Sequence, residues 1–181
     1  VFTMLSLSLF SASQPIGIIG AMDKEVAGLK NEMKVSKVSK IAGIEFFEGT
    51  LQGKEVVLLK SGVGKVNSAI ATDILIREFK VNKIIFTGVA GAVNDKLNVG
   101  DVVISTELVE HDFDTTAFGE KLGNVPGSDN GKFYANKDLV VKVYNFLLNE
   151  KKSITDKSLH VLCYDLRYFF KNNIEKQTAL H

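Results

Sequence analysis

Acidic side chains follow directly after an apolar run near the start of the chain. In "PIGIIGAMDKEV", residues 15–26, this run ends in a glycine turn and gives way to Asp23, Lys24 and Glu25. A carboxylate at such a place could hold a water molecule or accept a proton during catalysis. First-turn acids are also common because they oppose the helix macrodipole. Taken alone, the pattern favours this helix-start role for Glu25 over a catalytic one.

Other residues that could do chemistry are scattered. His111, Asp112 and Asp114 could indicate a metal site or acid–base work, but no partner stands at ligand spacing, so a loop turn is favoured. Asp165 follows the last predicted strand and is interpreted as a strand-end or N-cap residue. Three histidines and one cysteine, Cys163, predict neither a metal cluster nor an internal disulfide.

The stretch "SGVGKVNS", residues 61–68, resembles a phosphate-binding loop only superficially. The Walker pattern requires a glycine five residues before Gly64, where Leu59 stands, and Ser or Thr after Lys65, where Val66 stands. The dinucleotide fingerprint fails as well, because Asn67 occupies its third glycine position. A tight turn from strand to helix is the remaining interpretation.

Composition and charge narrow the class of protein. The 181 residues are 45% hydrophobic and 24% charged, which suits one domain with a proper core. A net charge of +1 gives no case for binding nucleic acid or a membrane surface.

The first residues resemble a secretory signal. Residues 2–10, "FTMLSLSLF", are apolar but too short to span a bilayer, and the small residues of "SASQ" follow them. We therefore expect residues 1–14 to be a signal-like or disordered extension and the protein to be exported or periplasmic. A cytoplasmic location is the alternative if this start is an artefact.

Hydrophobic periodicity predicts alternating strands and helices. Strands are expected at residues 16–19, on both sides of a turn at Gln52-Gly53, and at 99–105, 107–113 and 158–164. Residues 83–91 are expected to form a further strand that ends in a glycine-rich turn. Helical spacing recurs at Met22, Val26, Leu29 and Met33, then at Val66, Ile70 and Ile74, and after the N-cap Asn136. A long loop is expected at residues 115–133. The alternation indicates an α/β fold with a mostly parallel sheet.

Three glycine-containing turns each follow a predicted strand, at residues 20–22, 62–64 and 88–91. In a parallel sheet such turns lie at one edge, beyond the carboxyl ends of the strands, where open α/β sheets bind ligands. Glycine there lets a ligand approach the backbone closely. Glu25 is expected one helical turn beyond the first of these turns.

Five motifs in register resemble a known family. They are "IGIIGAMDKEV", "LLKSGVGKVNSA", "FTGVAGAV", "VGDVVIS" and "HDFDTTAFG…VPG". With them the chain resembles the bacterial 5′-methylthioadenosine/S-adenosylhomocysteine nucleosidases of the nucleoside phosphorylase superfamily, from about residue 16 to about residue 133 and weakly to about residue 150. The resemblance implies a mixed, mostly parallel central sheet flanked by helices, usually in a homodimer. It also implies hydrolysis of a thioadenosine nucleoside to adenine and a thioribose, with no metal or organic cofactor.

The resemblance also implies roles for matching residues. Cleavage leaves an oxocarbenium-like sugar, so the leaving adenine calls for an acid and the attacking water for a carboxylate. The family gives Glu25 the water-holding role. It places Ala21 and Met22 at the ribose and alkylthio end and Val63 in the apolar lining there. Ala90 and Gly91 would lie beside the purine and sugar, and Val89 stands where many members carry a Ser or Thr that helps hold the water. Phe118 and Pro126 would cover the partner subunit's alkylthio pocket. Thr115 stands where an apolar residue is expected.

Three family motifs are missing from the chain. They are S-G-D-x-F, whose aromatic stacks on adenine, E-M-E-A, whose glutamate binds the ribose hydroxyls, and S-D-x-A-D, whose aspartate protonates the purine. We therefore expect residues 15–162 to form an incomplete nucleosidase domain that lacks the C-terminal third and exposes apolar surface. Residues 163–181 resemble a divergent, frameshifted tail. Activity of this form is expected to be weak or absent.

A non-enzymatic function is the alternative. The chain would then be an exported binding protein, or a non-functional truncation product. Lys30, Lys34, Lys37 and Lys40 would engage a polyanion in the first case, although a solvated lysine face is the favoured interpretation.

Overall fold

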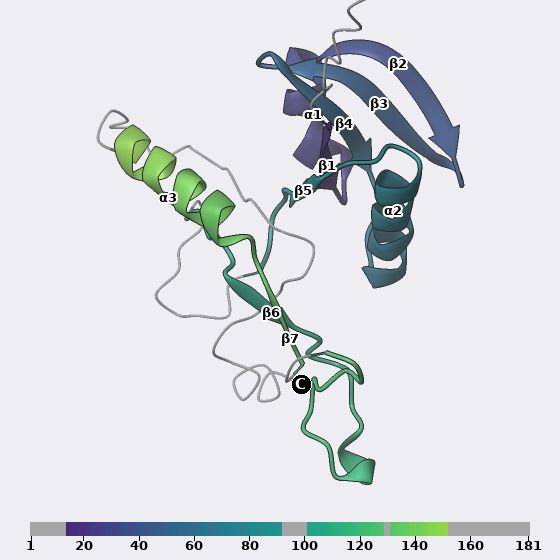
Figure 1. The fold of residues 1–181 in the computed structure, drawn as a ribbon, viewed down its shortest axis with the longest axis vertical. Coiled ribbons are helices and arrows are strands. Elements are labelled where there is room, and N and C mark those ends of the chain that lie inside the picture. The colour runs from purple at the N-terminus through teal and green to yellow at the C-terminus, as the bar shows by residue number, and fades with distance from the viewer. Residues whose placement is uncertain (1–13, 92–100, 129–130, 152–181) are drawn as a thin grey trace, which may run out of the picture.

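The computed structural model of the chain describes residues 14–91, 101–128 and 131–151. Residues 1–13 of the signal-like extension, the predicted strand at 158–164, Asp165 and the divergent tail lie outside the described residues. The elements, in chain order, are β1 (Ile16–Gly20), α1 (Asp23–Glu32), β2 (Lys34–Ile41), β3 (Ile44–Leu51), β4 (Lys54–Lys60), α2 (Lys65–Arg77), β5 (Lys83–Phe86), β6 (Glu107–Val109), the 3₁₀ turn η1 (Thr116–Phe118), β7 (Lys132–Tyr134) and α3 (Lys137–Lys151) (Figure 1).

Strands β1 to β5 form one sheet in the order β2-β3-β4-β1-β5. Strand β1 pairs in parallel with β4 on one side and with β5 on the other. Strands β2, β3 and β4 are joined by hairpins and pair antiparallel. The predicted mixed sheet flanked by helices is confirmed, and its parallel pairs, within the described residues, are those of β1.

Both hairpins turn through two consecutive residues with positive φ. Gln52 and Gly53 have φ angles of 48° and 73°, and Ala42 and Gly43 have φ angles of 50° and 81°. This left-handed pair is the geometry of a type I′ turn, whose twist matches that of the flanking antiparallel strands. The turn predicted at Gln52-Gly53 is confirmed.

The sequence pattern did not indicate strand β2. Its lysines recur every three residues, which masks the two-residue alternation of a strand. A bulge between Val35 and Lys37 shifts this alternation, so Lys34 and Lys37 share one face by register and Lys40 lies on the other. Lys37 pairs with Glu48 at 3.2 Å. The lysines of β2 are therefore divided between the two faces of the strand.

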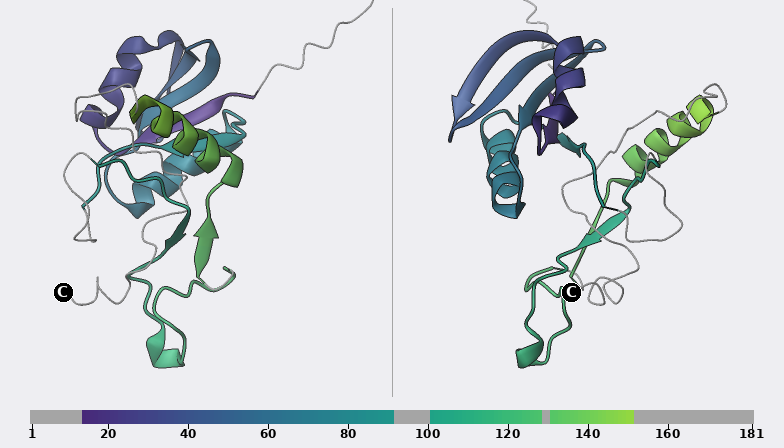
Figure 2. Two further views of the ribbon diagram at one scale, coloured as in Figure 1. Left: turned by 90° about the vertical axis from the view of Figure 1, so that its left-hand side faces the viewer. Right: turned by 180° about the vertical axis from the view of Figure 1, so that it is seen from behind.

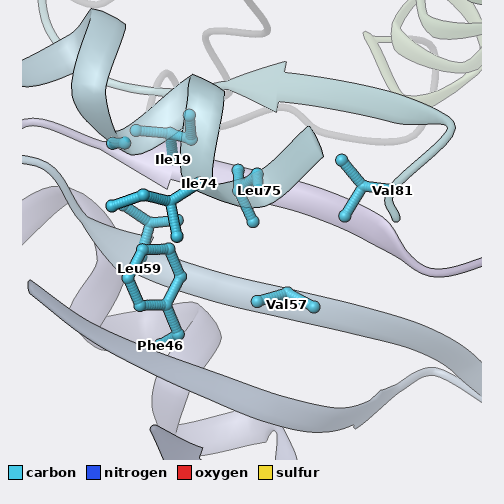
Figure 3. Close-up of a cluster of buried hydrophobic side chains, with 8 residues drawn as sticks. Ile19, Phe46, Val57, Leu59, Ile74, Leu75 and Val81 are labelled. Atoms are coloured by element: carbon cyan, nitrogen blue, oxygen red, sulfur yellow. The ribbon is translucent and has the colours of Figure 1, made fainter. Parts of the chain in front are cut away.

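One face of the sheet packs against α2. The buried cluster there joins Ile74 and Leu75 of the helix to strand residues that include Ile19 and Phe46 (Figure 3). Phe46 is fully buried, and its ring stacks on that of Phe79 at a centroid distance of 4.8 Å. Burial of these apolar side chains holds α2 to the sheet.

The opposite face packs against α1. Val26 and Met33 are buried against Ile18, Val56 and Leu58. Figures 1 and 2 show the two helices on opposite sides of the sheet. Because both faces are covered, β1 and β4 are apolar on both faces, as strands of a parallel sheet usually are.

The buried face of α2 differs from the predicted one. The spacing of Val66, Ile70 and Ile74 indicated a buried stripe, but Val66 is 72% exposed and Ile70 is 42% exposed. The helix instead buries Ala71, Ile74 and Leu75. Ile74 is therefore buried as predicted, whereas Val66 and Ile70 are not. Alanine is a weak hydrophobic marker, yet its small side chain allows close approach to the sheet, so the periodicity did not indicate Ala71.

Residues 101–151 add the small sheet of β6 and β7 and the helix α3. Leu108 and Ala135 are buried there, with Phe133 and Val140 packed against them. Helix α3 begins as predicted, because the Asn136 Oδ1 accepts a hydrogen bond from the Leu139 N–H at 3.0 Å. None of the described helices is long and apolar enough to cross a membrane.

Two strand predictions in this region were wrong in their extent. Residues 101–105 pair with no described strand, and the strand predicted at 107–113 ends at Val109. The predicted loop at 115–133 contains η1 and gives way to β7 at its end. Apolar runs such as residues 102–104 need a partner strand to form a ladder, and periodicity does not identify that partner.

Candidate functional site

The three glycine-containing turns lie at one edge of the sheet. β1 is the central strand there, and its last residues bond to the exits of both neighbours. The Ser61 N–H donates to the Gly20 carbonyl at 2.9 Å, and the Thr87 N–H donates to the Ile19 carbonyl at 2.8 Å. The turns that follow β1, β4 and β5 therefore begin side by side, as parallel pairing predicts.

Glu25 bridges two of these turns with its carboxylate. It lies in the first turn of α1, where its Oε2 accepts a hydrogen bond from the Met22 N–H at 2.8 Å. Its Oε1 accepts a second hydrogen bond from the Val89 N–H, beyond β5, at 2.9 Å. Glu25 thus caps its own helix and also reaches a turn far along the chain. The helix-start role and a role in the site are both compatible with this geometry.

Gly88 makes room for the Glu25 carboxylate. A Cβ atom at residue 88 would lie 2.8 Å from the Glu25 Cδ and closer still to Oε1. Any side chain there would push the carboxylate away from the Val89 N–H. Sequence reasoning noted the glycine turn but did not single out Gly88, and its place directly before Val89 was the available clue.

Ser61 and Lys60 also escaped notice in the sequence. Ser61 is the buried polar residue at the exit of β4, and its hydroxyl donates to the Gly62 carbonyl at 2.9 Å. The Lys60 Nζ lies 2.9 Å from an Asp23 carboxylate oxygen, so Asp23 joins α1 to the end of β4. These contacts fix the first two turns to each other.

The apolar side chains predicted for the site lie in the three turns, and most of them are open to solvent. Met22 and Val89, whose N–H groups bind the carboxylate, both carry exposed side chains, and Val63 in the middle turn is 71% exposed. Ala21 is half-buried, and Ala90 and Gly91 are exposed.

The predicted loop residues are not brought to this edge within the chain. Phe118, in η1, is 87% exposed, and Pro126 is also exposed. Figures 1 and 2 place η1 at the far end of the molecule from the five-stranded sheet. Thr115, where an apolar residue was expected, has a buried hydroxyl oxygen with no hydrogen-bond partner among the described residues.

A cluster of charges joins the start of α2 to the segment after β6. The Lys65 Nζ lies 2.9 Å from Glu110 Oε2 and 2.5 Å from Asp112 Oδ1. The hydrogen bond from Lys65 lowers the pKa of Asp112, and the hydrogen bonds to Asp112 and Glu110 raise the pKa of Lys65. Folding lowers the Asp112 pKa, so the ionised Asp112 stabilises the folded state. This stabilisation is fully present above the ordinary Asp pKa and is lost as the pH falls through the lowered pKa.

Asp114 takes part in a local turn. Its Oδ1 accepts a hydrogen bond from the Thr116 N–H at 2.9 Å, and this bond lowers the pKa of Asp114. The loop-turn interpretation of these acids fits their contacts. Within residues 14–91, 101–128 and 131–151, no group of His, Cys, Asp and Glu is arranged to hold a metal ion.

The arrangement can support polar chemistry on a partly apolar ligand. A carboxylate has about four acceptor positions, and the two backbone N–H groups occupy two of those on Glu25. The remaining positions can accept hydrogen bonds from a water molecule or from ligand hydroxyl groups. The negative charge would also stabilise a cation formed close by.

Comparison with known proteins places the chain among its relatives. The family model described as the phosphorylase superfamily matches residues 15–164. A 5′-methylthioadenosine/S-adenosylhomocysteine nucleosidase of Bacillus cytotoxicus is 50% identical over 125 residues, which are 69% of this chain and 54% of that protein. The protein of the same name from Bacillus cereus strain G9842 is 46% identical over 147 residues, 81% of this chain and 61% of the relative.

Solved structures show the same likeness. The nucleosidase of that name from Colwellia psychrerythraea 34H, crystallised with adenine, has a TM-score of 0.72 and 41% identity over 78% of this chain and 58% of that chain. The present chain thus spans little more than half the length of these relatives. The match of the family model reaches beyond α3, to residue 164. From this match, the sequence identity and the shared fold together, the chain belongs to the phosphorylase superfamily and, within it, to the family of the 5′-methylthioadenosine/S-adenosylhomocysteine nucleosidases.

Proposed function

We propose that the protein hydrolyses the N-glycosidic bond of methylthioadenosine or S-adenosylhomocysteine, releasing adenine and a thioribose. The observation that carries the proposal is the Glu25 carboxylate, held by two backbone N–H groups among exposed apolar side chains. The names of the relatives supply the substrate class, because the curated relatives are nucleosidases of these two compounds.

In the proposed mechanism Glu25 holds the attacking water. Its Oε1 and Oε2 are each fixed by one backbone donor, so the carboxylate does not need to reorient when the water binds. Water that bonds to a remaining lone pair is oriented toward the sugar carbon and loses its proton to the carboxylate. The same negative charge stabilises the oxocarbenium-like ribosyl group as the bond to adenine breaks.

Water rather than phosphate is the proposed nucleophile. A phosphate ion bound beside Glu25 would face its negative charge. The nearby cations Lys60 and Lys65 already pair with Asp23 and with the acids of residues 110 and 112. This charge arrangement favours a neutral nucleophile over an anionic one.

We further propose that the 181-residue chain alone is a weak catalyst. The S-D-x-A-D and E-M-E-A motifs, which supply the purine acid and the ribose-binding glutamate in the family, do not occur in it. Lack of a general acid alone typically costs about a hundred- to ten-thousand-fold in rate. A chain that carries these motifs as well would have full activity.

Adenine release tests the proposal. The purified chain, incubated at high concentration with methylthioadenosine or S-adenosylhomocysteine, should release adenine slowly and at the same rate with or without phosphate. The sugar product should be the free thioribose. Release that requires phosphate and yields a sugar 1-phosphate would contradict the choice of water. No release, together with no binding of either nucleoside by calorimetry, would contradict the function.

We propose that two copies assemble through the exposed face of α2. Val66 and Ile70 of this helix and Val63 before it form an exposed apolar strip beside the turns of the site. In a dimer this strip would be covered, and Phe118 and Pro126 of each subunit would reach the partner's alkylthio pocket, as the family resemblance implies.

Sedimentation velocity tests this assembly. The chain is expected to sediment as a dimer, and Val66→Asp should shift it to a monomer because a charge would be buried in the contact. Val38→Asp, at an exposed valine of β2, is the matched control and should leave the dimer intact. A wild-type monomer at all accessible concentrations would contradict the proposed assembly.

A further inference from the structure

Lys65 contacts two parts of the molecule that lie far apart in the sequence. It is the first residue of α2 and stands two residues after Val63, in the middle turn of the site. Its ammonium group bonds to Glu110 and Asp112, which follow directly after β6. The segment that begins with these acids continues to Phe118 in η1. One side chain therefore links the middle turn to the base of the Phe118 loop.

The geometry of this link is more specific than that of a single surface ion pair. Two carboxylates from alternate residues of one segment converge on the same Nζ, at 2.9 and 2.5 Å. An ammonium group has three donors, so it can bond to both acids at once. A single exposed ion pair contributes little to the stability of a fold. Two pairs that share one cation restrict both the direction of the segment and its distance from that cation.

The loop beyond this link has its own hydrogen bonds. The Thr116 N–H donates to Asp114, the Phe118 N–H to the Thr115 carbonyl, and the Gly123 N–H to the Phe113 carbonyl. These bonds give the loop a defined local shape but do not attach it to the sheet. The direction of the loop relative to α2 depends on contacts at its base, where Lys65 pairs with Glu110 and Asp112.

We propose that Lys65 is a positioning residue that holds the segment from Glu110 to Phe118 in a fixed direction relative to the Val63 turn. The effect on substrate rests on the proposed nucleosidase function and assembly, in which Phe118 covers the alkylthio pocket of the partner subunit. Lys65 touches no reacting atom in this scheme. Its loss would weaken the binding of the alkylthio group and leave the chemistry at Glu25 unchanged.

Hydrogen exchange on the full chain tests the positioning directly. Lys65→Met should accelerate amide exchange at residues 110–113, the base of the loop that Lys65 contacts, by about two- to tenfold, as expected for the loss of two exposed ion pairs. Lys65→Arg, which keeps the charge, should restore slow exchange. Lys37→Met removes a comparable surface pair with Glu48 and is the matched control, with no change in this loop. Unchanged exchange in Lys65→Met overturns the proposal, whatever the activity.

Kinetics test the functional part. Lys65→Met should raise KM for methylthioadenosine about threefold or more, with kcat unchanged and with no change in KM for adenosine, which has no alkylthio group. A purely structural role would instead change both substrates alike, or lower kcat, and either result overturns the positioning of Phe118. If the wild-type chain neither releases adenine nor binds either nucleoside, the proposed function fails separately, and the exchange measurement alone decides whether Lys65 holds the segment.

Discussion

Replacement of Glu25 by glutamine is expected to lower adenine release by about a hundred- to ten-thousand-fold. The amide cannot accept the proton of the attacking water at neutral pH. It also has one acceptor oxygen instead of two, so either the Met22 or the Val89 N–H must face an NH₂ group. The rate of adenine release from methylthioadenosine measures the effect.

The neighbouring acid provides the control for this variant. Asp23 also lies in the first turn of α1, but its carboxylate pairs with Lys60 and does not contact the Val89 turn. Asp23→Asn removes a similar charge from the same helix end together with the exposed pair to Lys60, so it reports these electrostatic losses without disturbing the contact with the Val89 turn. We expect it to keep activity within a few-fold of the wild type. Equal losses in the two variants would show that Glu25 acts only as a helix-start acid.

Gly88→Ala is expected to reduce activity by about ten- to a hundredfold, because displacement of a catalytic group by about 1 Å can cost that much. The new Cβ would lie 2.8 Å from the Glu25 Cδ, so the carboxylate must leave its place on the Val89 N–H. The obstacle is the carboxylate that the site uses, so the chain cannot relax by moving an unimportant side chain. The rate of adenine release and the urea midpoint of unfolding should both be measured.

Gly28→Ala is the matched control for this substitution. Gly28 lies in α1, and a Cβ there would meet nothing within 4 Å. Alanine favours a helix over glycine by roughly 1 kcal/mol, so this variant should be slightly more stable than the wild type and equally active. If Gly88→Ala kept wild-type activity while folding normally, the position of the Glu25 carboxylate in the structure would not be the one that supports catalysis.

Local sequence patterns determined much of the fold. The apolar run before Gly20, the helical spacing from Met22 to Met33 and the turn at Gln52-Gly53 each depend on interactions between residues close in the chain. Such patterns correctly predicted β1, α1, β3, β4, β5 and the start of α3. Parallel pairing then required that the glycine turns meet at one edge of the sheet.

Two features that depend on contacts between different segments, strand β2 and the buried side of α2, were missed or assigned wrongly. The three-residue lysine spacing concealed β2, because a bulge shifts its alternation. The buried side of α2 was assigned to Val66, Ile70 and Ile74, although only Ile74 of these packs on the sheet, together with Ala71 and Leu75. In both places the deciding contact comes from a neighbouring strand, which periodicity along one segment does not contain.

By itself, then, the sequence determined the elements around β1 and the presence of an acid at the first turn of α1. Only the tertiary structure decided what that acid does there. The Glu25 carboxylate lies on the Val89 N–H because β5 is next to β1, and Gly88 leaves the space for it. The pairing of Lys65 with Glu110 and Asp112 was decided in the same way. These contacts join residues more than forty positions apart in the sequence. Their geometry depends on the order of the strands in the sheet and on the path of the chain after β5 and β6.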